Sequence, residues 1–159
     1  MSALIHHTLH LAQRGTALLE RAQPLAQLAA RLFIAQVFFQ AGLTKLNDWS
    51  TTLLLFENEY SVPLLPPLWA AWAGTAGELV LPVLLVLGLA GRFAAAGLFV
   101  VNLVAVLSLA DIAPAALQLH QFWGTVLLAL VLWGPGRWSL DAWWWARLAP
   151  GRGAGTAPR

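Results

Sequence analysis

Glu78 is an acidic residue inside a long apolar run, WAAWAGTAGELVLPVLLVLGLAG. A charged side chain at the centre of a bilayer costs about 2.5–3.5 kcal/mol on insertion scales, so it persists where it faces other helices and finds a partner. Ala71, Gly74 and Thr75 share the helical face of Glu78, and such small residues let another backbone come close. We therefore expect Glu78 to point toward neighbouring helices.

Pro82 adds a second polar group at the same place. A proline in a helix removes the hydrogen bond to the carbonyl four residues earlier, which here belongs to Glu78. The position then offers both a carboxyl group and an unpaired backbone acceptor. Both need donors in a dry environment.

Arg31 is the first candidate donor for Glu78. Arg31, Gly42 and Lys45 lie on one face of a helix over residues 24–46, and the depth of Arg31 differs from that of Glu78 by under ~10 Å at 1.5 Å per residue. We expect an Arg31–Glu78 pair, with Asn102 as the second candidate donor. Such a pair could be a structural link within the protein, or it could relay protons or contact a ligand such as a quinone.

Lys45, Asp111 and His120 could form a second polar cluster nearer the other membrane surface. His120 could either lie at the interface without a chemical role or exchange protons and bind a ligand.

Three further histidines precede the apolar runs: His6, His7 and His10. They contain an i, i+4 pair with the spacing of a metal-binding helix face. No carboxylate lies nearby in the sequence, so we expect no metal site there.

The composition indicates a membrane protein. Of the 159 residues, 59% are hydrophobic and 10% are charged, whereas about 25% of the residues of a soluble domain are charged. The formal charge of +2 comes from scattered arginines that are too sparse for a nucleic-acid surface. The absence of cysteine excludes disulfides, thiolate nucleophiles and thiol-based electron transfer.

Four apolar runs have the length of a bilayer crossing, and they span residues 24–46, 66–89, 92–110 and 116–133. Seven of the nine Lys and Arg residues would fall on one side of such a bundle, which the positive-inside rule places in the cytoplasm. The sequence therefore predicts an all-α protein: a four-transmembrane-helix antiparallel bundle over residues 24–134, with both termini cytoplasmic.

Short amphipathic segments flank these runs. Residues 1–23 have an apolar stripe typical of a helix that lies on a membrane surface. Asp48 could cap a short surface helix that carries Trp49, Phe56 and Tyr60. Residues 135–149 form a Trp-rich interfacial segment, and we expect residues 150–159 to be a disordered tail.

The order of these features resembles the DoxX family of small four-helix membrane proteins. The resemblance covers about residues 25–135. It rests on Arg31, AGLTKL (41–46), LLLFENEYSVPLLPP (53–67), ELVLP (78–82) and VLGLAGR (86–92). His120 followed by LWGPGRWSLD (132–141) is similar to a proteobacterial subgroup that accompanies modification systems for copper-responsive peptides.

The resemblance implies a role beside membrane-associated oxidoreductases, including thiosulfate:quinone oxidation. The positions that match the family are Arg31, Gly42, Lys45, Glu78, Gly88 and Arg92. We expect an inner-membrane subunit of a redox or metal-stress system, without catalytic activity alone. It would contact the lipid bilayer, dock a protein partner or a second copy of itself, and bind a quinone or lipid near Arg31 and Glu78. The alternatives are a small transporter or channel with a polar path through Glu78, Asn102 and His120, and a structural membrane anchor.

Overall fold

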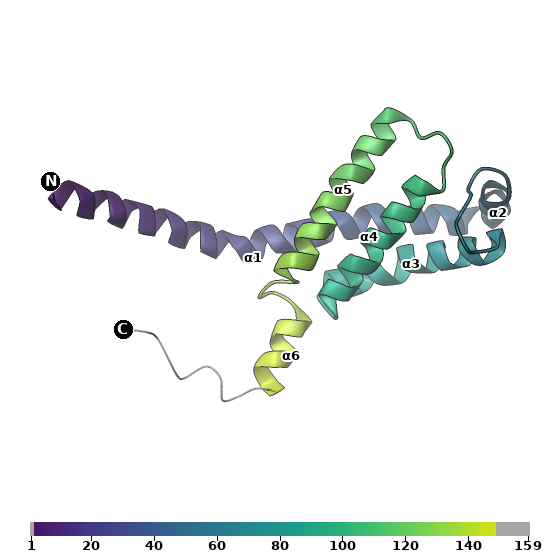
Figure 1. Ribbon diagram of the computed structural model, residues 1–159. Coiled ribbons are helices and arrows are strands. Elements are labelled where there is room, and N and C mark those ends of the chain that lie inside the picture. The colour runs from purple at the N-terminus through teal and green to yellow at the C-terminus, as the bar shows by residue number, and fades with distance from the viewer. Residues whose placement is uncertain (1, 149–159) are drawn as a thin grey trace.

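The structure, a computed structural model, describes residues 2–148, with side chains from residue 13 onward (Figure 1). This part of the chain is helical and contains no strand. Its helices are α1 (Ser2–Asn47), α2 (Trp49–Asn58), α3 (Pro67–Leu87), α4 (Gly91–Leu107), α5 (Pro114–Trp133) and α6 (Leu140–Leu148). The all-α prediction is thus confirmed for the described residues, while the expected tail at 150–159 lies outside them.

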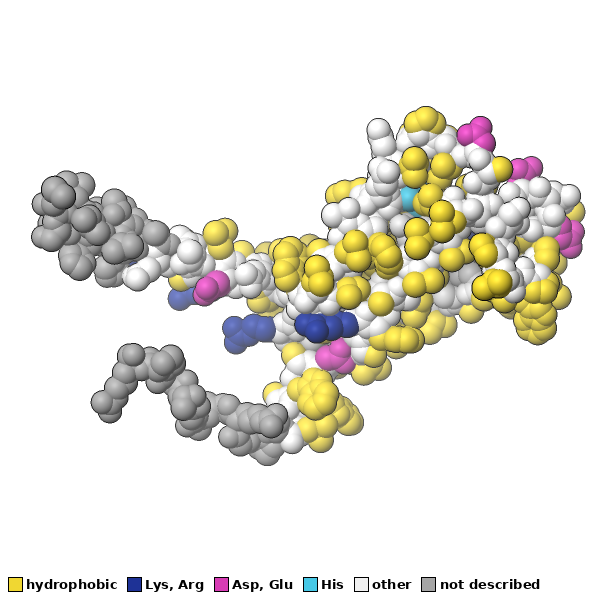
Figure 2. All heavy atoms as spheres, in the orientation of Figure 1, with side chains coloured by type: hydrophobic (Ala, Val, Ile, Leu, Met, Phe, Trp, Pro, Cys, Tyr) yellow, Lys and Arg dark blue, Asp and Glu magenta, His cyan; other side chains and the backbone are white. Residues whose placement is uncertain are grey.

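Four long helices form the helical core. The second half of α1 packs along α3, α3 packs on α4, α4 packs on α5, and α5 also contacts α1. All four helices contribute to the buried centre, whose members include Ile34, Phe38, Leu85, Leu98 and Leu127. Hydrophobic side chains also cover the visible outer face (Figure 2). Water would disfavour such a large apolar surface, but acyl chains would cover it well.

Three of these helices are long and apolar enough to cross a membrane: α1 within Gln13–Asn47, α3 and α5. Helix α4 is also apolar but has 17 residues. At 1.5 Å per residue it is about 26 Å long, slightly less than a typical hydrocarbon core. The predicted apolar runs therefore correspond to helices, and the ends of α3, α4 and α5 differ from the expected ones by a few residues.

Helix α1 does not begin at Pro24, contrary to the sequence-based expectation. Pro24 lies inside a continuous helix of 46 residues, whose first half extends beyond the other helices (Figure 1). Proline removes one backbone hydrogen bond from a helix interior. The side chains around this position are mostly exposed, so the surroundings can solvate the carbonyl that loses its partner.

Helix α2 begins where the sequence predicts, after the cap Asp48. The Asp48 carboxylate accepts hydrogen bonds from the Thr51 amide at 2.9 Å, the Thr51 hydroxyl at 2.7 Å and the Ser50 hydroxyl at 2.8 Å. These bonds, the Thr51 amide first among them, favour the charged carboxylate and hold the pKa of Asp48 below its ordinary value. Helix α2 then packs Phe56 against Ala70 and Ala71 of α3.

Helix α6 is tied to the turn between α3 and α4. Both oxygens of the Asp141 carboxylate accept backbone hydrogen bonds there, from the amides of Ala90 and Gly91 at 2.8 Å each. In return, the Asp141 amide donates to the Gly88 carbonyl at 3.0 Å. We call this end of the molecule the α6 end. The α2 end lies at the other side of the helical core and holds α2 and the connection between α4 and α5. There the Ser61 amide donates a hydrogen bond to the Ser108 carbonyl.

Candidate functional site

Lys45 and Glu78 form an ion pair between α1 and α3. Lys45 Nζ lies 2.5 Å from Glu78 Oε2, and the exposed fractions of the two side chains are 23% and 9%. Lys45 comes from the last turn of α1, whereas Glu78 lies in the middle of α3. The expectation that Glu78 is sheltered among helices and satisfied there by a cation is confirmed.

Gly42 explains why Lys45 reaches Glu78. A Cβ atom at position 42 would lie 2.9 Å from Leu79 Cγ and 3.1 Å from Glu78 Cβ, so α1 and α3 approach each other closely where α1 lacks a side chain. Close contacts at small residues are typical of helix pairs in membranes. Lys45 follows Gly42 by about one turn and is therefore the cation nearest to Glu78.

The predicted Arg31–Glu78 pair is wrong. Arg31 lies 11 residues before Gly42, which places it about 16 Å from that contact along α1, beyond the reach of its side chain. It is 1% exposed, and its Nη2 donates to the Trp138 carbonyl at 2.5 Å. Within the described residues its Nε and Nη1 atoms have no hydrogen-bond partner.

The guanidinium of Arg31 lies instead at the α6 end, beside Gly88 and Ser139. Gly88 ends α3 with φ of +64°, a conformation that side chains disfavour, and a Cβ atom there would collide with Arg31 Nη1 and Ser139 Cβ. Arg31 thus helps to hold the segment that leads into α6. Sequence reasoning missed this contact because Trp138 and Ser139 are distant from Arg31 along the chain.

Asn102 and His120 form a second polar pair, between α4 and α5, in which Asn102 is buried and His120 is half-buried. Asn102 Nδ2 donates to the His120 carbonyl at 3.0 Å, and Asn102 Oδ1 lies 2.8 Å from His120 Nδ1. Because the amide oxygen can only accept a hydrogen bond, His120 Nδ1 is the donor in this contact. The ring also packs edge-on against Trp123, with centroids 4.9 Å apart.

The expected cluster of Lys45, Asp111 and His120 does not form. Lys45 pairs with Glu78, His120 pairs with Asn102, and Asp111 is exposed in the connection between α4 and α5. The buried polar groups therefore belong to two separate pairs of helices. One pair of side chains joins α1 to α3, and the other joins α4 to α5. Thr75, one turn before Glu78, has a buried hydroxyl with no partner among the described residues.

The structure does not test whether the three N-terminal histidines bind a metal ion. The side chains of His6, His7 and His10 lie outside the described residues. Within the residues that are described, no group of three or more His, Cys, Asp or Glu side chains could hold a metal ion.

A shallow apolar groove of about 460 Å³ lies between α1 and α3. Its lining includes Leu32, Ala35, Phe39, Pro82, Val83 and Val86, and Gln36 is its polar member. Pro82 follows Glu78 by four residues, or about 6 Å along α3. Ala35 of α1 and Pro82 of α3 both line this groove. The sequence does not show that these two residues belong to one groove, because the alignment of the two helices is not known from it.

Comparison with models of protein families matches residues 26–111, more than half of the chain, to the family described as DoxX. The chain belongs to the DoxX family. In this DoxX protein the matched region includes the Lys45–Glu78 pair, Arg31, Asn102 and Asp111, whereas His120 and α6 lie beyond it. Searches of the curated proteins and of the solved structures returned no match.

Proposed function

We propose that this DoxX protein is a multi-pass subunit of the bacterial inner membrane that binds a quinone in the α1–α3 groove. It would serve a redox or metal-stress system, of which the copper-associated one suggested by the sequence is the specific candidate. In this proposal α4 is the fourth span of an antiparallel bundle, and both termini are cytoplasmic. The protein would work with a partner protein or with a second copy of itself, and it would have no catalytic activity alone.

The distribution of charge supports this orientation. Figure 2 shows Lys and Arg side chains gathered toward the α6 end, and several acidic side chains at the α2 end. Arg92 begins α4, Arg137 precedes α6 and Arg147 lies on α6. Cations next to membrane spans favour the cytoplasmic side, so the α6 end would face the cytoplasm.

The observation that carries the quinone proposal is the partly buried Lys45–Glu78 pair, whose carboxylate lies about one helical turn from the groove residue Pro82. Ligand sites are largely apolar pockets of about 300–1,000 Å³ with a few polar groups that fix orientation. The groove has that character. Because the exposed face of Val83 would meet lipid, an isoprenoid tail could enter from the bilayer. A quinone ring could then approach the ion pair or Gln36.

Quinone reduction requires electrons that this protein cannot supply from thiols of its own. Reduction of a quinone to a quinol takes two electrons and two protons. The chain has no cysteine, so thiols of its own cannot supply the electrons, and in this proposal the partner protein delivers them. Both protons come from water, and Glu78 is the group suited to take one up and pass it to the ring, while Lys45 balances the charge of the carboxylate between transfers.

Extraction of quinone from the purified protein tests this proposal. Val83→Trp fills the groove from its outer face, whereas Val80→Trp adds the same bulk to an exposed position of α3 outside the groove. We expect quinone, measured by mass spectrometry of the extract, to copurify with the wild type and with Val80→Trp but not with Val83→Trp. Wild-type protein without quinone, or equal quinone content in both variants, would contradict the proposal.

Transport is the rival function, with a polar path past Glu78, Asn102 and His120. The observation in its favour is the buried hydroxyl of Thr75 on the face of Glu78, because an unsatisfied hydroxyl could contact a passing solute. Solute flux in proteoliposomes that disappears in Glu78→Ala would favour transport. A structural anchor would bind no quinone and would carry no flux.

A further inference from the structure

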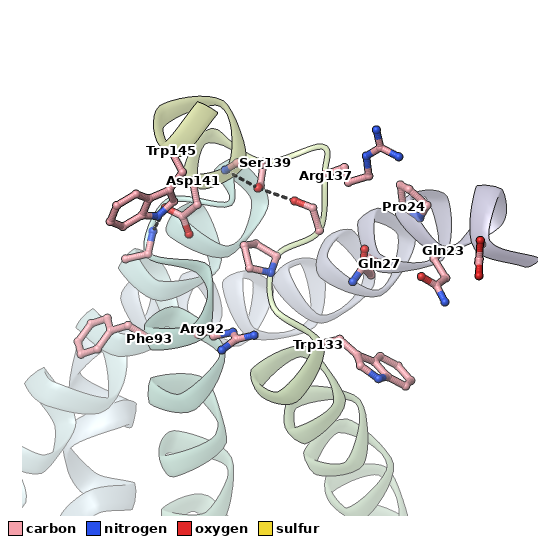
Figure 3. Close-up of a pocket in the computed structure, with 15 residues that line it drawn as sticks. Gln23, Pro24, Gln27, Arg92, Phe93, Trp133, Arg137, Ser139, Asp141 and Trp145 are labelled. Atoms are coloured by element: carbon pink, nitrogen blue, oxygen red, sulfur yellow. Dashed lines mark hydrogen bonds between the residues drawn. The ribbon is translucent and has the colours of Figure 1, made fainter. Parts of the chain in front are cut away.

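A cavity of about 930 Å³ opens at the α6 end, away from the α1–α3 groove (Figure 3). Its walls come from the middle of α1, the start of α4, the end of α5 and the segment that continues into α6. The side chains that concern a ligand are Gln27, Arg92, Phe93, Trp133, Arg137 and Trp145. The family match and the quinone proposal assign no role to this cavity.

The cavity carries an excess of positive charge. Arg92 and Arg137 both line it and are exposed, and the ion pair found within residues 13–148 involves neither of them. Arg92 has one long hydrogen bond, from Nη2 to the Leu132 carbonyl at 3.3 Å. Each guanidinium therefore keeps most of its donors available.

Two acidic residues also line the cavity, but they offset this charge only in part. The Asp141 carboxylate is engaged by the backbone amides of Ala90 and Gly91, at the N-terminal end of α4. There the positive end of the helix dipole offsets its charge. Glu20 is exposed on the first half of α1. The cavity thus favours an anion with oxygen acceptors.

The aromatic side chains indicate that the ligand also has an apolar part. Phe93, Trp133 and Trp145 line the cavity and are 68%, 72% and 68% exposed. Tryptophan at this level of a membrane protein is typical of the interface between headgroups and acyl chains. Guanidinium groups match phosphate oxygens with two parallel hydrogen bonds. A molecule with a phosphate next to acyl chains satisfies both features.

We infer that this cavity binds the phosphate headgroup of an anionic membrane lipid. Arg92 contacts the phosphate, the amide of Gln27 contacts the polar headgroup, and the acyl chains pass over Trp133. The Arg137 side chain points away from Arg92 and adds positive charge at the rim of the cavity (Figure 3). A lipid held in this way joins the extended half of α1 to α4 and α6. This binding is independent of a quinone, because the cavity and the α1–α3 groove share no lining residue.

Lipid titration of the full-length protein in detergent, followed by native mass spectrometry, tests the inference. The probes are phosphatidylglycerol, phosphatidylcholine, glycerol phosphate and inorganic phosphate. The cavity variant is Arg92→Gln with Arg137→Gln. The matched control is Arg14→Gln with Arg21→Gln, which removes the same charge from exposed positions of α1 that do not line the cavity.

We expect the wild type and the control to bind phosphatidylglycerol equally, and more tightly than phosphatidylcholine. The cavity variant should lose at least about tenfold in affinity for phosphatidylglycerol, since it lacks the charge-assisted contact of Arg92 and the nearby positive charge of Arg137. A third variant, Arg92→Lys with Arg137→Lys, should retain part of the binding and so shows that loss of charge, not misfolding, causes the effect. Its thermal unfolding should match that of the wild type.

Three results would overturn the inference. Equal affinity for phosphatidylglycerol and phosphatidylcholine would mean that the cavity does not distinguish an anionic headgroup from a zwitterionic one. An equal loss in the cavity variant and the control would mean diffuse attraction to the whole cationic end. Glycerol phosphate or inorganic phosphate that binds as tightly as phosphatidylglycerol would replace the lipid with a soluble phosphate ligand.

Discussion

Gly42 of α1 lies directly against Glu78 of α3, so close that a Cβ atom on the glycine would be 3.1 Å from Glu78 Cβ. This contact fixes the register of the two helices and thereby selects Lys45 as the partner of the buried carboxylate. The same register leaves Arg31 at the α6 end, beside Gly88. One small residue thus decides which of two cations serves the intramembrane site.

Gly42→Leu should separate α1 from α3 and weaken the Lys45–Glu78 pair. A larger side chain in a filled contact costs about 1–3 kcal/mol of stability, so we expect a lower midpoint of thermal unfolding in detergent. Gly15→Leu is the matched control, because nothing lies within 4 Å of a Cβ atom at position 15. Equal midpoints for the two variants would show that the contact at Gly42 is not close-packed.

The Lys45–Glu78 pair should show strong coupling in a double-mutant cycle. Removal of one partner of a buried ion pair costs about 3–5 kcal/mol because the other charge stays buried alone. Lys45→Met and Glu78→Gln should each lower stability, and the double variant should be more stable than the sum of the single effects predicts. Glu78→Ala should lower yield or activity more than Glu78→Gln does. Additive effects of Lys45→Met and Glu78→Gln would contradict the pairing.

The helices could be predicted from the sequence more fully than the contacts between them. The sequence predicts a span over residues 66–89, and this range contains α3, because an apolar run bounded by prolines and glycines indicates a helix by itself. The partner of Glu78 could not be chosen in this way. Arg31 and Lys45 share one face of α1, and only the register against α3 separates them.

The contact between α6 and the start of α4 could not be predicted from the sequence either. The tryptophans of residues 138–145 suggested an interfacial segment, but nothing near Asp141 in the sequence indicates that it caps the start of α4. That contact joins residues 51 and 50 positions apart, and it depends on the left-handed turn at Gly88 and Ala90. Long-range contacts to backbone groups leave no periodic pattern.

Asp141→Ala should loosen the start of α4. The variant removes the acceptor of the Ala90 and Gly91 amides, and loss of such a cap costs about 1 kcal/mol. We expect faster hydrogen exchange at these two amides and earlier cleavage of α6 by trypsin after Arg147. Asp141→Asn keeps one acceptor oxygen and should give intermediate exchange. Unchanged protection of Gly91 in Asp141→Ala would show that the carboxylate does not cap α4.

The cap of α2 should make the α2 end sensitive to acid. Hydrogen bonds from Thr51 and Ser50 lower the pKa of Asp48 in the folded protein, whereas in the unfolded chain it is about 3.9. The stabilisation is therefore fully present above about pH 4 to 5, and it is lost as the pH falls through the lower folded pKa.

Trp49 reports on this change, because it lies beside the cap and packs on Trp72 of α3 with ring centroids 4.4 Å apart. We expect the tryptophan fluorescence of the wild type to change reversibly at acidic pH. Asp48→Asn keeps an oxygen acceptor but cannot titrate, so its signal should stay flat over the same range. An identical acid transition in Asp48→Asn would assign the change to another group.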